Sequence, residues 1–301
     1  MNSTELRTKG QSQAALLLVR RRLAGVPALR EAQAEMASWR DISPSESLLR
    51  ATSLLRRLIG GPFLTELVNF ELEQIATNPR YVPPGRFGTA ALLEVDGWEL
   101  AMTTGPAFPL GSSAVLSSIE RDVAFGVAGG PAVRFTRYRF AGISDWEVFD
   151  RSACLVRLGS VALEPGQAVA LDSALEIIEP VRLPASTVLT LASPARRAFA
   201  WEFDRNSLRA YRHVIADLAA TRIAYAPELL VQLDSAGSVP VLAELTTHPR
   251  HFVRWNAVKA LCALDAKAGL QALEAARADA HPHVRRAAEA SLANVAAQDV
   301  A

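Results

Sequence analysis

The sequence has few of the residues that metal and redox chemistry require. It contains two cysteines and five histidines, and no histidine precedes His213. Cys154 and Cys262 fall in different predicted regions, so we interpret each as a small buried hydrophobe and not as half of a disulfide. Because sites for Fe²⁺, Mn²⁺ or Zn²⁺ need imidazole or thiolate ligands, we expect no metal and no cofactor.

Long hydrophobic runs and a strong net charge are also missing. The first 13 residues show no signal-peptide pattern, and the apolar run 14–19 is too short to span a bilayer. We therefore expect a cytoplasmic protein that does not enter a membrane. The net charge of +1 provides no general attraction to nucleic acid, so a nucleic-acid partner is not favoured.

The motifs of several enzyme classes are absent. The chain has no Gly-x-Ser-x-Gly nucleophile elbow, no phosphate-binding loop, no Gly-x-Gly-x-x-Gly and no Cys-x-x-Cys. On these grounds the sequence favours a non-enzymatic protein.

Residues 1–82 are predicted to be helical. Ser43, Pro44 and Glu46 form a helix start, with a hydroxyl cap, a first-turn proline and an acid near the N-terminus. The arginines at 20–22 are interpreted as a solvated helix end, with an anion site as the alternative. Apolar residues at helical spacing predict two helices, one carrying Leu48, Leu49, Leu54, Leu55 and Leu58, and one over 63–76 with Leu64, Leu67, Val68, Leu72 and Ile75 on one side.

From about residue 88 to 204 the hydrophobic pattern changes toward period two, with turn residues between short apolar runs. Asp96-Gly97 separates two such runs and is a strong two-residue hairpin signal. We predict roughly ten strands, enough for a closed or nearly closed double-sheet structure. The expected strands are 92–95, 98–102, 115–119, 123–127, 133–140, 154–158, 168–171, 175–178, 188–191 and 198–203.

The tripeptide at 164–166 opens a stretch that resembles the first motif of cupins, which are small β-barrels that often hold a metal. That motif runs glycine, five residues, His-x-His, three or four residues, glutamate, six residues, glycine. Counting from the glycine of the tripeptide, Asp172 and Ala174 occupy the histidine positions, Glu179 the glutamate position and Ser186 the second glycine position. Both histidines are absent, so the resemblance implies a cupin-like barrel that has lost its metal.

Two alternatives remain for the polar residues of this region. Asp172, Glu179, Arg182 and Arg137 could line the cavity of the barrel, as in a small-molecule sensor or an enzyme. Asp172 and Glu179 could instead be ordinary solvent-facing strand residues, which is the interpretation we favour.

The last third of the chain contains an internal repeat with a period of 31 residues. A period near 30 with two helices per unit is typical of an α-solenoid. The second helix of each unit resembles the short, Ala-rich kind of HEAT repeat, and this resemblance implies a macromolecular partner. The residues that return at this offset are Val239, Leu242, Leu245, Val253, Arg254, Ala257 and Leu261, which become Leu270, Leu273, Ala276, Val284, Arg285, Ala288 and Leu292.

A further helix pair is predicted before the repeats. Asn206-Ser207 caps a helix that runs to about residue 224, with Leu208, Tyr211 and Ile215 on one face. A second helix is expected at 227–233. Together they would act as the capping unit of a stack of three helix pairs.

Candidate binding residues follow from the HEAT resemblance, because second helices line the concave face in that family. Trp255, Lys259 and Arg286 are the surface candidates for partner binding, and Trp and Arg are common at binding hot spots. Arg254 and Arg285 match the Val-Arg arginine, which in the family tends to hydrogen-bond along the stack.

The histidines at 248, 251, 281 and 283 accompany prolines in the turns between predicted helices. We interpret them as turn residues and not as a metal site, because no acid or cysteine joins them at ligand spacing.

The sequence therefore predicts an α+β multidomain protein with an N-terminal helical region (1–82), an all-β cupin-like barrel (83–205) and a C-terminal α-α HEAT-like solenoid (206–301). The predicted function is a non-enzymatic interaction or scaffold protein. Its repeats would bind a protein partner, and its barrel would serve as a scaffold or form a homodimer. The alternative is a sensor or enzyme that uses the barrel cavity.

Overall fold

The computed structural model describes residues 19–40, 42–78, 80–81, 89–104, 114–182 and 185–298. These residues form two compact units. The sheet unit comprises the described residues up to 143, together with 151–196 and 200–212. The helical unit comprises 144–150, 197–199 and the described residues from 213 onward.

The sheet unit contains antiparallel strands in three ladders, with the orders β1-β2-β9-β4-β7, β11-β10-β3 and β6-β5-β8. Each strand that the sequence predicts overlaps an observed one, and β11 is an addition. The bounds are β1 Thr89–Val95, β2 Trp98–Thr104, β3 Val115–Ser117, β4 Val123–Gly129, β5 Val133–Ala141, β6 Cys154–Leu163, β7 Ala168–Leu171, β8 Glu176–Arg182, β9 Thr187–Ala192, β10 Phe199–Asp204 and β11 Ala210–Ile215.

The hairpin predicted at Asp96-Gly97 joins β1 and β2. Val95 pairs with Trp98, and the two turn residues have φ angles of 50° and 82°. Two successive left-handed residues match the right-handed twist of the flanking strands, which is why this dipeptide favours the turn. The prediction of this hairpin is confirmed.

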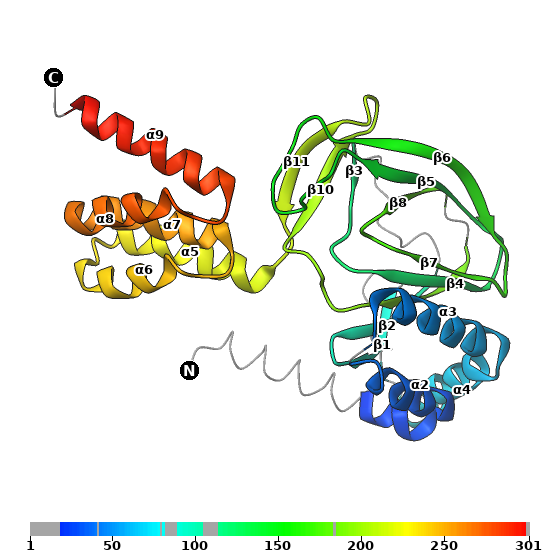
Figure 1. Ribbon diagram of the computed structural model, residues 1–301. Coiled ribbons are helices and arrows are strands. Elements are labelled where there is room, and N and C mark those ends of the chain that lie inside the picture. Colours follow the sequence, from blue (N-terminus) through cyan, green and yellow to red (C-terminus); the bar gives the residue numbers. More distant parts are fainter. Residues whose placement is uncertain are drawn as a thin grey trace. The chain divides into compact units, whose positions relative to one another are not determined.

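The five-stranded sheet is buried on both faces. Along β4, Ala124 and Gly126 face the helices, whereas Phe125 and Val127 pack against Val133 and its neighbours on β5. The helices α2 (Pro27–Ala37), α3 (Pro44–Gly60) and α4 (Phe63–Thr77) lie on one side of this sheet, and β5, β6 and β8 lie on the other (Figure 1).

The helices share one hydrophobic core with the five-stranded sheet. Leu29 of α2, Leu55 of α3 and Phe63 of α4 are fully buried in the same cluster as Leu100 and Leu189 of the sheet. The described part of the chain therefore has two compact units, whereas the sequence predicted three regions. A separate domain boundary at residue 82 would expose both sides of this core.

A single closed barrel is not seen among the described strands. β4 and β5 are consecutive in the chain but belong to different ladders. The chain passes between them through Gly130, whose φ of 87° favours glycine. The arrangement is therefore a double sheet with a covered face, and the cupin-like barrel stays a prediction.

The two predicted N-terminal helices are present, but one packs differently from the prediction. Ser43 caps α3 by accepting a hydrogen bond from the Glu46 amide, as expected. On α4, however, the buried residues are Phe63, Leu67 and Phe70. The remaining members of the predicted stripe are partly buried or exposed, and this part of the prediction is wrong. Both faces of α4 are apolar, so spacing alone did not identify the packed one.

Arg22 is buried, which contradicts its interpretation as part of a solvated helix end. Its Nε donates to Glu71 Oε1 at 2.8 Å and its Nη1 donates to the Ala91 carbonyl at 3.0 Å. Tyr81 donates to the second oxygen of Glu71 at 2.7 Å. Burial, with the hydrogen bond and charge of Glu71, raises the pKa of Tyr81 to about 12.

We expect Arg22→Ala to lower the free energy of unfolding of the sheet unit by about 3 kcal/mol, because Glu71 would keep its charge in a largely buried position without its partner. Urea unfolding at neutral pH measures this. The control is Arg21→Ala, which removes an exposed arginine and should change the free energy by less than about 0.5 kcal/mol. Equal effects of the two substitutions would show that the buried ion pair does not stabilise the fold.

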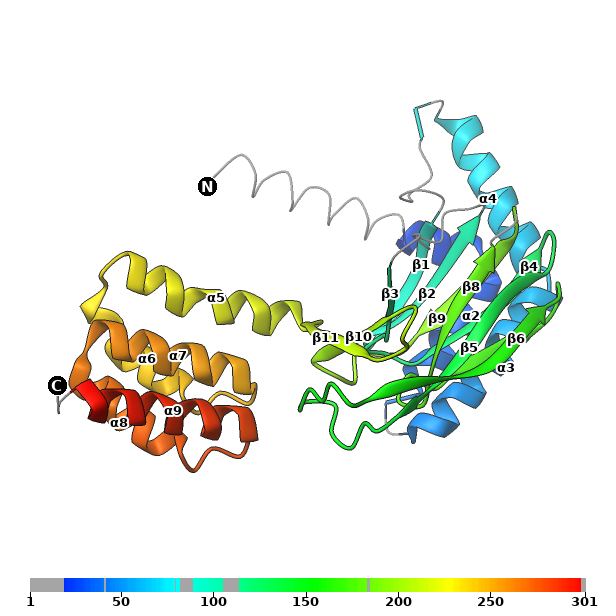
Figure 2. The ribbon, with the colours of Figure 1, turned by 90° about the horizontal axis from the view of Figure 1, so that it is seen from above.

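The helical unit contains α5 (Leu218–Gln232), a 3-10 turn (Ala236–Ser238), α6 (Val239–Leu245), α7 (His251–Leu264), α8 (Ala266–Ala276) and α9 (Pro282–Gln298). Figure 2 shows α5, α7 and α9 as the long helices of this unit. The second repeat, α8 and α9, follows the first, α6 and α7, at the predicted offset.

The helix pair predicted before the repeats is wrong in both halves. Asp204 Oδ1 accepts hydrogen bonds from the Asn206 and Ser207 amides, so these residues form a turn between β10 and β11 and not a helix cap. The helix begins later, where Asp217 accepts from the Ala220 amide. It continues through Pro227 as one helix, so the unit has two helix pairs preceded by a single helix.

Candidate functional site

The two Val-Arg arginines hold the turns that precede their own helices. Arg254 Nη1 donates to the carbonyls of His248 and Pro249 at 2.9 and 3.0 Å. Arg285 Nη1 donates to the carbonyls of Asp279 and Ala280 at 2.7 and 2.8 Å. The acceptors are again 31 residues apart, so the two repeats have the same contacts as well as the same spacing.

Arg254 also connects one repeat to the next. Its Nε and Nη2 donate to the two carboxylate oxygens of Asp279 at 2.8 and 2.6 Å. Burial opposes ionisation of Asp279, but the hydrogen bonds from Arg254 and the His281 amide outweigh it and hold the pKa of this carboxyl below its usual range. The two side chains are only 14% and 9% exposed, so Arg254 stabilises the stack and offers little surface to a partner.

We expect Arg254→Ala to destabilise the helical unit by about 3 kcal/mol, because it leaves two carbonyls and a nearly buried carboxylate without their donor. The control is Arg277→Ala, which breaks an exposed pair with Glu274 and should cost less than about 1 kcal/mol. Urea unfolding followed by circular dichroism compares them. A small loss for Arg254→Ala would mean that water replaces this arginine without penalty.

The turns use equivalent residues as caps. His248 Nδ1 accepts from the Arg250 amide at 3.1 Å, and Asp279 Oδ1 accepts from the His281 amide at 2.7 Å. The interpretation of His248 as a turn residue agrees with this contact. In the second turn the equivalent position is Asp279, and His281 corresponds to Arg250.

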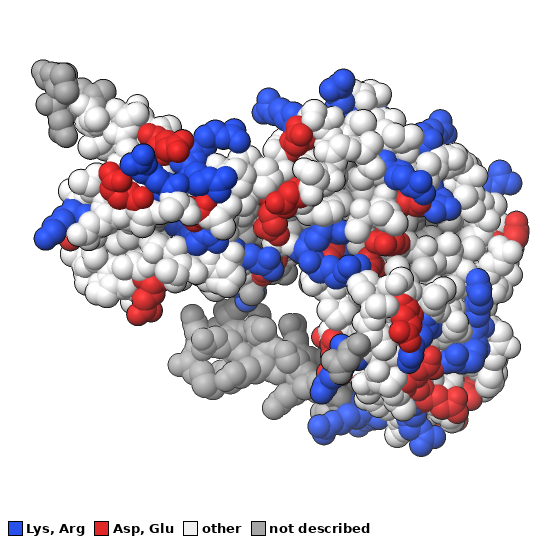
Figure 3. Space-filling view, viewed as in Figure 1, with Lys and Arg blue, Asp and Glu red and all other residues white. Residues whose placement is uncertain are grey.

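The surface candidates differ in exposure. Lys259 on α7 and Arg286 on α9 are exposed. Trp255 is half-buried and packs against the cluster formed by Val258, Leu273, Ala276, Val284 and Ala288. Its indole therefore contributes to the contact between repeats and presents one edge to solvent. On the visible face of the helical unit, Figure 3 shows acidic and basic side chains interspersed, so no single-sign surface forms there.

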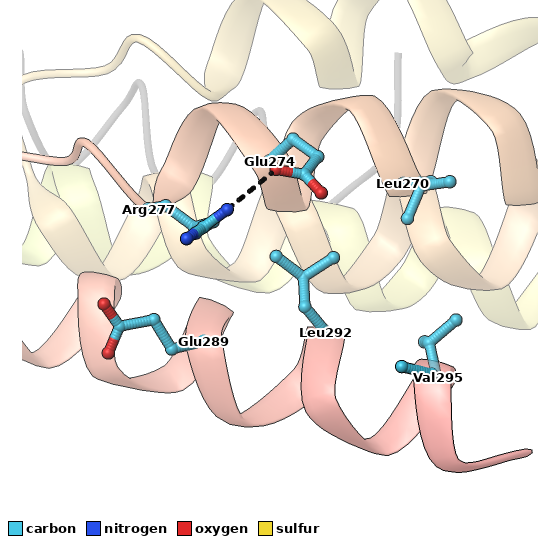
Figure 4. A pocket seen from close by; sticks show the side chains of 7 residues that line it. Leu270, Glu274, Arg277, Glu289, Leu292 and Val295 are labelled. Carbon is cyan, nitrogen blue, oxygen red and sulfur yellow. Dashed lines mark hydrogen bonds and ion pairs between the residues drawn. The ribbon is translucent and has the colours of Figure 1, made fainter.

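A groove of about 450 Å³ runs between α8 and α9 (Figure 4). Leu270, Leu292 and Val295 provide apolar walls, and Glu274 and Arg277 pair across 3.4 Å on α8. Leu270 and Leu292 were recognised in the sequence as repeat positions. Their participation in an open groove was not predicted, because the residues that would cover them in a longer stack are absent here.

Four aromatic rings form a continuous stack inside the helical unit. His213 lies against Phe199 with ring centroids 4.5 Å apart, Phe199 against His251 at 5.3 Å, and His251 against His281 at 3.6 Å. Phe149 adds a contact to His213 at 5.3 Å. The stack thus joins the segments 144–150 and 197–199 to the turns that precede α7 and α9.

Hydrogen bonds fix the tautomer of His281. Its Nδ1 accepts from the His283 amide at 3.3 Å and so carries no proton. Its Nε2 lies 3.0 Å from the Glu147 carbonyl and must be the donor there. The Glu147 carboxylate lies 3.6 Å from His251 Nδ1. The contact with His251 holds the pKa of Glu147 below its usual range, against the effect of burial.

The stack favours neutral imidazoles. Burial, with the neighbouring His251 and His283, lowers the pKa of His213 to about 4, and no described residue bonds its buried Nδ1. Burial also lowers the pKa of His281, against the hydrogen bond to Glu147. Burial and the adjacent Arg286 lower the pKa of His283.

We expect the helical unit to lose stability as the pH falls from 6.5 toward 4. In this window the unfolded chain binds a proton at His213, whose usual pKa is 6.5, and the folded chain does not, so acid favours unfolding. The loss from His213 should reach about 1–2 kcal/mol after allowance for solvent screening.

Thermal unfolding between pH 4 and 8 measures this dependence. The control is His213→Phe, which keeps a ring in the stack and removes its titration. The variant should show a flatter profile between pH 4 and 6.5. An unchanged profile would show that His213 does not contribute.

The polar residues suggested for a barrel pocket do not converge in the structure. Arg137 donates to Glu176, and Glu179 accepts from Tyr138 Oη at 2.8 Å and pairs with Arg205. Asp172 Oδ1 accepts from the Ala174 amide within a turn. Arg182 pairs with Arg134 in the β5–β8 ladder, but its side chain lies outside the described residues.

Two searches bear on other classes of site. Within the described residues, no group of three or more His, Cys, Asp and Glu side chains is arranged to hold a metal ion. No described helix has the length and hydropathy needed to cross a bilayer.

The family model for HEAT repeats matches residues 216–293. This match covers α5 to α9 and less than half of the chain. No curated protein matches the chain.

Two solved structures are similar to parts of it. One is hydroquinone 1,2-dioxygenase PnpCD in complex with Cd²⁺ and 4-hydroxybenzonitrile, with 13% identity, a TM-score of 0.25, and coverage of 40% of this chain and 70% of that one. The other is a sugar phosphate isomerase from a cupin superfamily of Silicibacter pomeroyi, with 14% identity, a TM-score of 0.20, and coverage of 46% and 86%. Likenesses at these TM-scores carry no argument about fold or activity.

Proposed function

We propose that this protein is a non-enzymatic interaction protein whose helical repeats bind a protein partner through α7 and α9. The observation that carries this proposal is the HEAT repeat match over 216–293, since HEAT repeats commonly mediate protein interaction. The sheet unit is proposed to act as a scaffold or dimerisation unit.

The surface of the second helices supports this assignment. Lys259 and Arg286 are exposed, and Trp255 between them is half-buried. A rigid aromatic side chain with neighbouring cations is typical of binding hot spots, because little side-chain entropy is lost on contact. The arginines that hold the turns, Arg254 and Arg285, would position this surface and not contact the partner directly.

The sensor or enzyme alternative has less support. The carboxylates and arginines that it requires are engaged with one another or with backbone amides, as described above. Nucleic acid is also less favoured, because the net charge is +1 and both signs of charge are interspersed on the visible face (Figure 3).

The test is a double substitution, Lys259→Glu with Arg286→Glu, in affinity capture from extracts of the source organism. Reversing two exposed charges should reduce capture of the partner at least about tenfold, because like charges would then face its complementary surface. Trp255 is left intact, since its replacement would also disturb the core between repeats.

The matched control is Lys267→Glu, which makes the same exposed charge change on the first helix α8. A protein captured by the native chain and by this control, but not by the double variant, is the expected result. If every captured protein is retained equally by all three chains, α7 and α9 do not form the binding surface.

A further inference from the structure

The helix α4 has an apolar face that the rest of the described chain leaves exposed. Val68, Leu72 and Ile75 are 53%, 57% and 42% exposed. They are spaced by four and three residues, so their side chains form one stripe along the helix, away from the face that packs on the core. Scattered exposed apolar residues are ordinary, but a continuous stripe of this kind marks an interaction surface.

The stripe is bordered by uncharged residues. Thr65, Asn69 and Ala76 are exposed on its flank. Two of the acids on α4 are used elsewhere, because Glu66 accepts from the Ala28 amide at 3.1 Å and Glu71 pairs with Arg22. Depletion of charge is the compositional signal of the centre of a protein interface.

The charges of α4 argue against a lipid surface as the occupant. The helix contains three glutamates and neither lysine nor arginine. Helices that lie on anionic membranes carry basic residues beside their apolar face. A strongly charged protein partner would likewise find no complementary charge at the stripe.

A second copy of the chain fits the stripe best. Leu64, Val68 and Leu72 form a ridge at intervals of four residues, and ridges of this kind interdigitate when two helices cross. A two-fold axis would bring the same ridge from each copy together, and the absence of charge means that no like charges meet there. In an antiparallel pair the helix dipoles would also oppose favourably.

We propose that Val68, Leu72 and Ile75 form the centre of a contact between two copies of this chain, in which the two α4 helices pack antiparallel across a two-fold axis. This inference rests on the dimerisation role proposed for the sheet unit and is independent of the partner of the repeats. One helix pair buries less than the roughly 1,200 Å² of a standard interface, so the dimer should dissociate in the micromolar range.

Sedimentation velocity of the full chain over a range of concentrations tests the proposal. The native mass should rise from 32.4 kDa toward twice that value. Leu72→Glu should raise the dissociation constant at least about tenfold, because it places two carboxylates at the centre of the contact. Glutamate is a good helix former and Leu72 is exposed, so the fold should persist, which circular dichroism checks.

A charge pair identifies the occupant. Leu72→Lys should also be monomeric, and a mixture of the two variants should dimerise again, because opposite charges then meet at the axis. The matched control is Leu49→Glu, which makes the same change at a side chain on α3 that is 70% exposed. It should dimerise like the native chain.

Three results would overturn the proposal. A native chain that stays monomeric at about 0.2 mM, far above a micromolar dissociation constant, would leave the stripe to another partner. Dimerisation of Leu72→Glu at native strength would place the contact elsewhere. A mixture of the charge variants that stays monomeric would show that the two α4 helices do not meet. The double variant at Lys259 and Arg286 should dimerise normally, which separates this test from that of the repeats.

Discussion

Burial of both faces of the five-stranded sheet is the constraint on which the sheet unit depends. Alternate residues of β4 and β9 point to opposite sides, and each side presents large apolar groups. An apolar face exposed to water would cost roughly 25 cal/mol per Å², so both faces need a cover. The helices α2 to α4 cover one and the β5–β6–β8 ladder covers the other. The N-terminal helices are therefore part of this unit and not an independent domain.

The strands were largely predictable because their signals are local. Period-two alternation and the Asp96-Gly97 turn act within a few residues. β11 was missed because Asn206-Ser207 has the residue types of a helix cap, whereas both amides bond to Asp204. The same residue types satisfy either backbone arrangement, and the choice was made by the pairing of β10 with β11. The packed face of α4 was missed for a related reason, since its sequence offers two apolar faces and the sheet accepts one.

The candidate site divides in the same way. The arginines of the repeats were predictable from an offset of 31 residues, and the structure gives both of them the same turn contacts. The histidine stack was not predictable, because Phe199 and Glu147 are far from His251 and His281 in the sequence. Each histidine had a sufficient local explanation as a turn residue. Tertiary packing brings four rings together, and their desolvation shifts the pKa values.

Adjacent arginines on α9 show why residue type alone does not assign a role. Arg285 and Arg286 are consecutive, yet the first donates to two turn carbonyls and the second is exposed. A rotation of about 100° per residue separates them on the helix. On α7, Arg254 and Lys259 differ in the same way, with one cation turned toward the next repeat and the other toward solvent. Helical phase thus separates the cations that hold the repeats in register from those available to a partner, and the buried set keeps the exposed set in place.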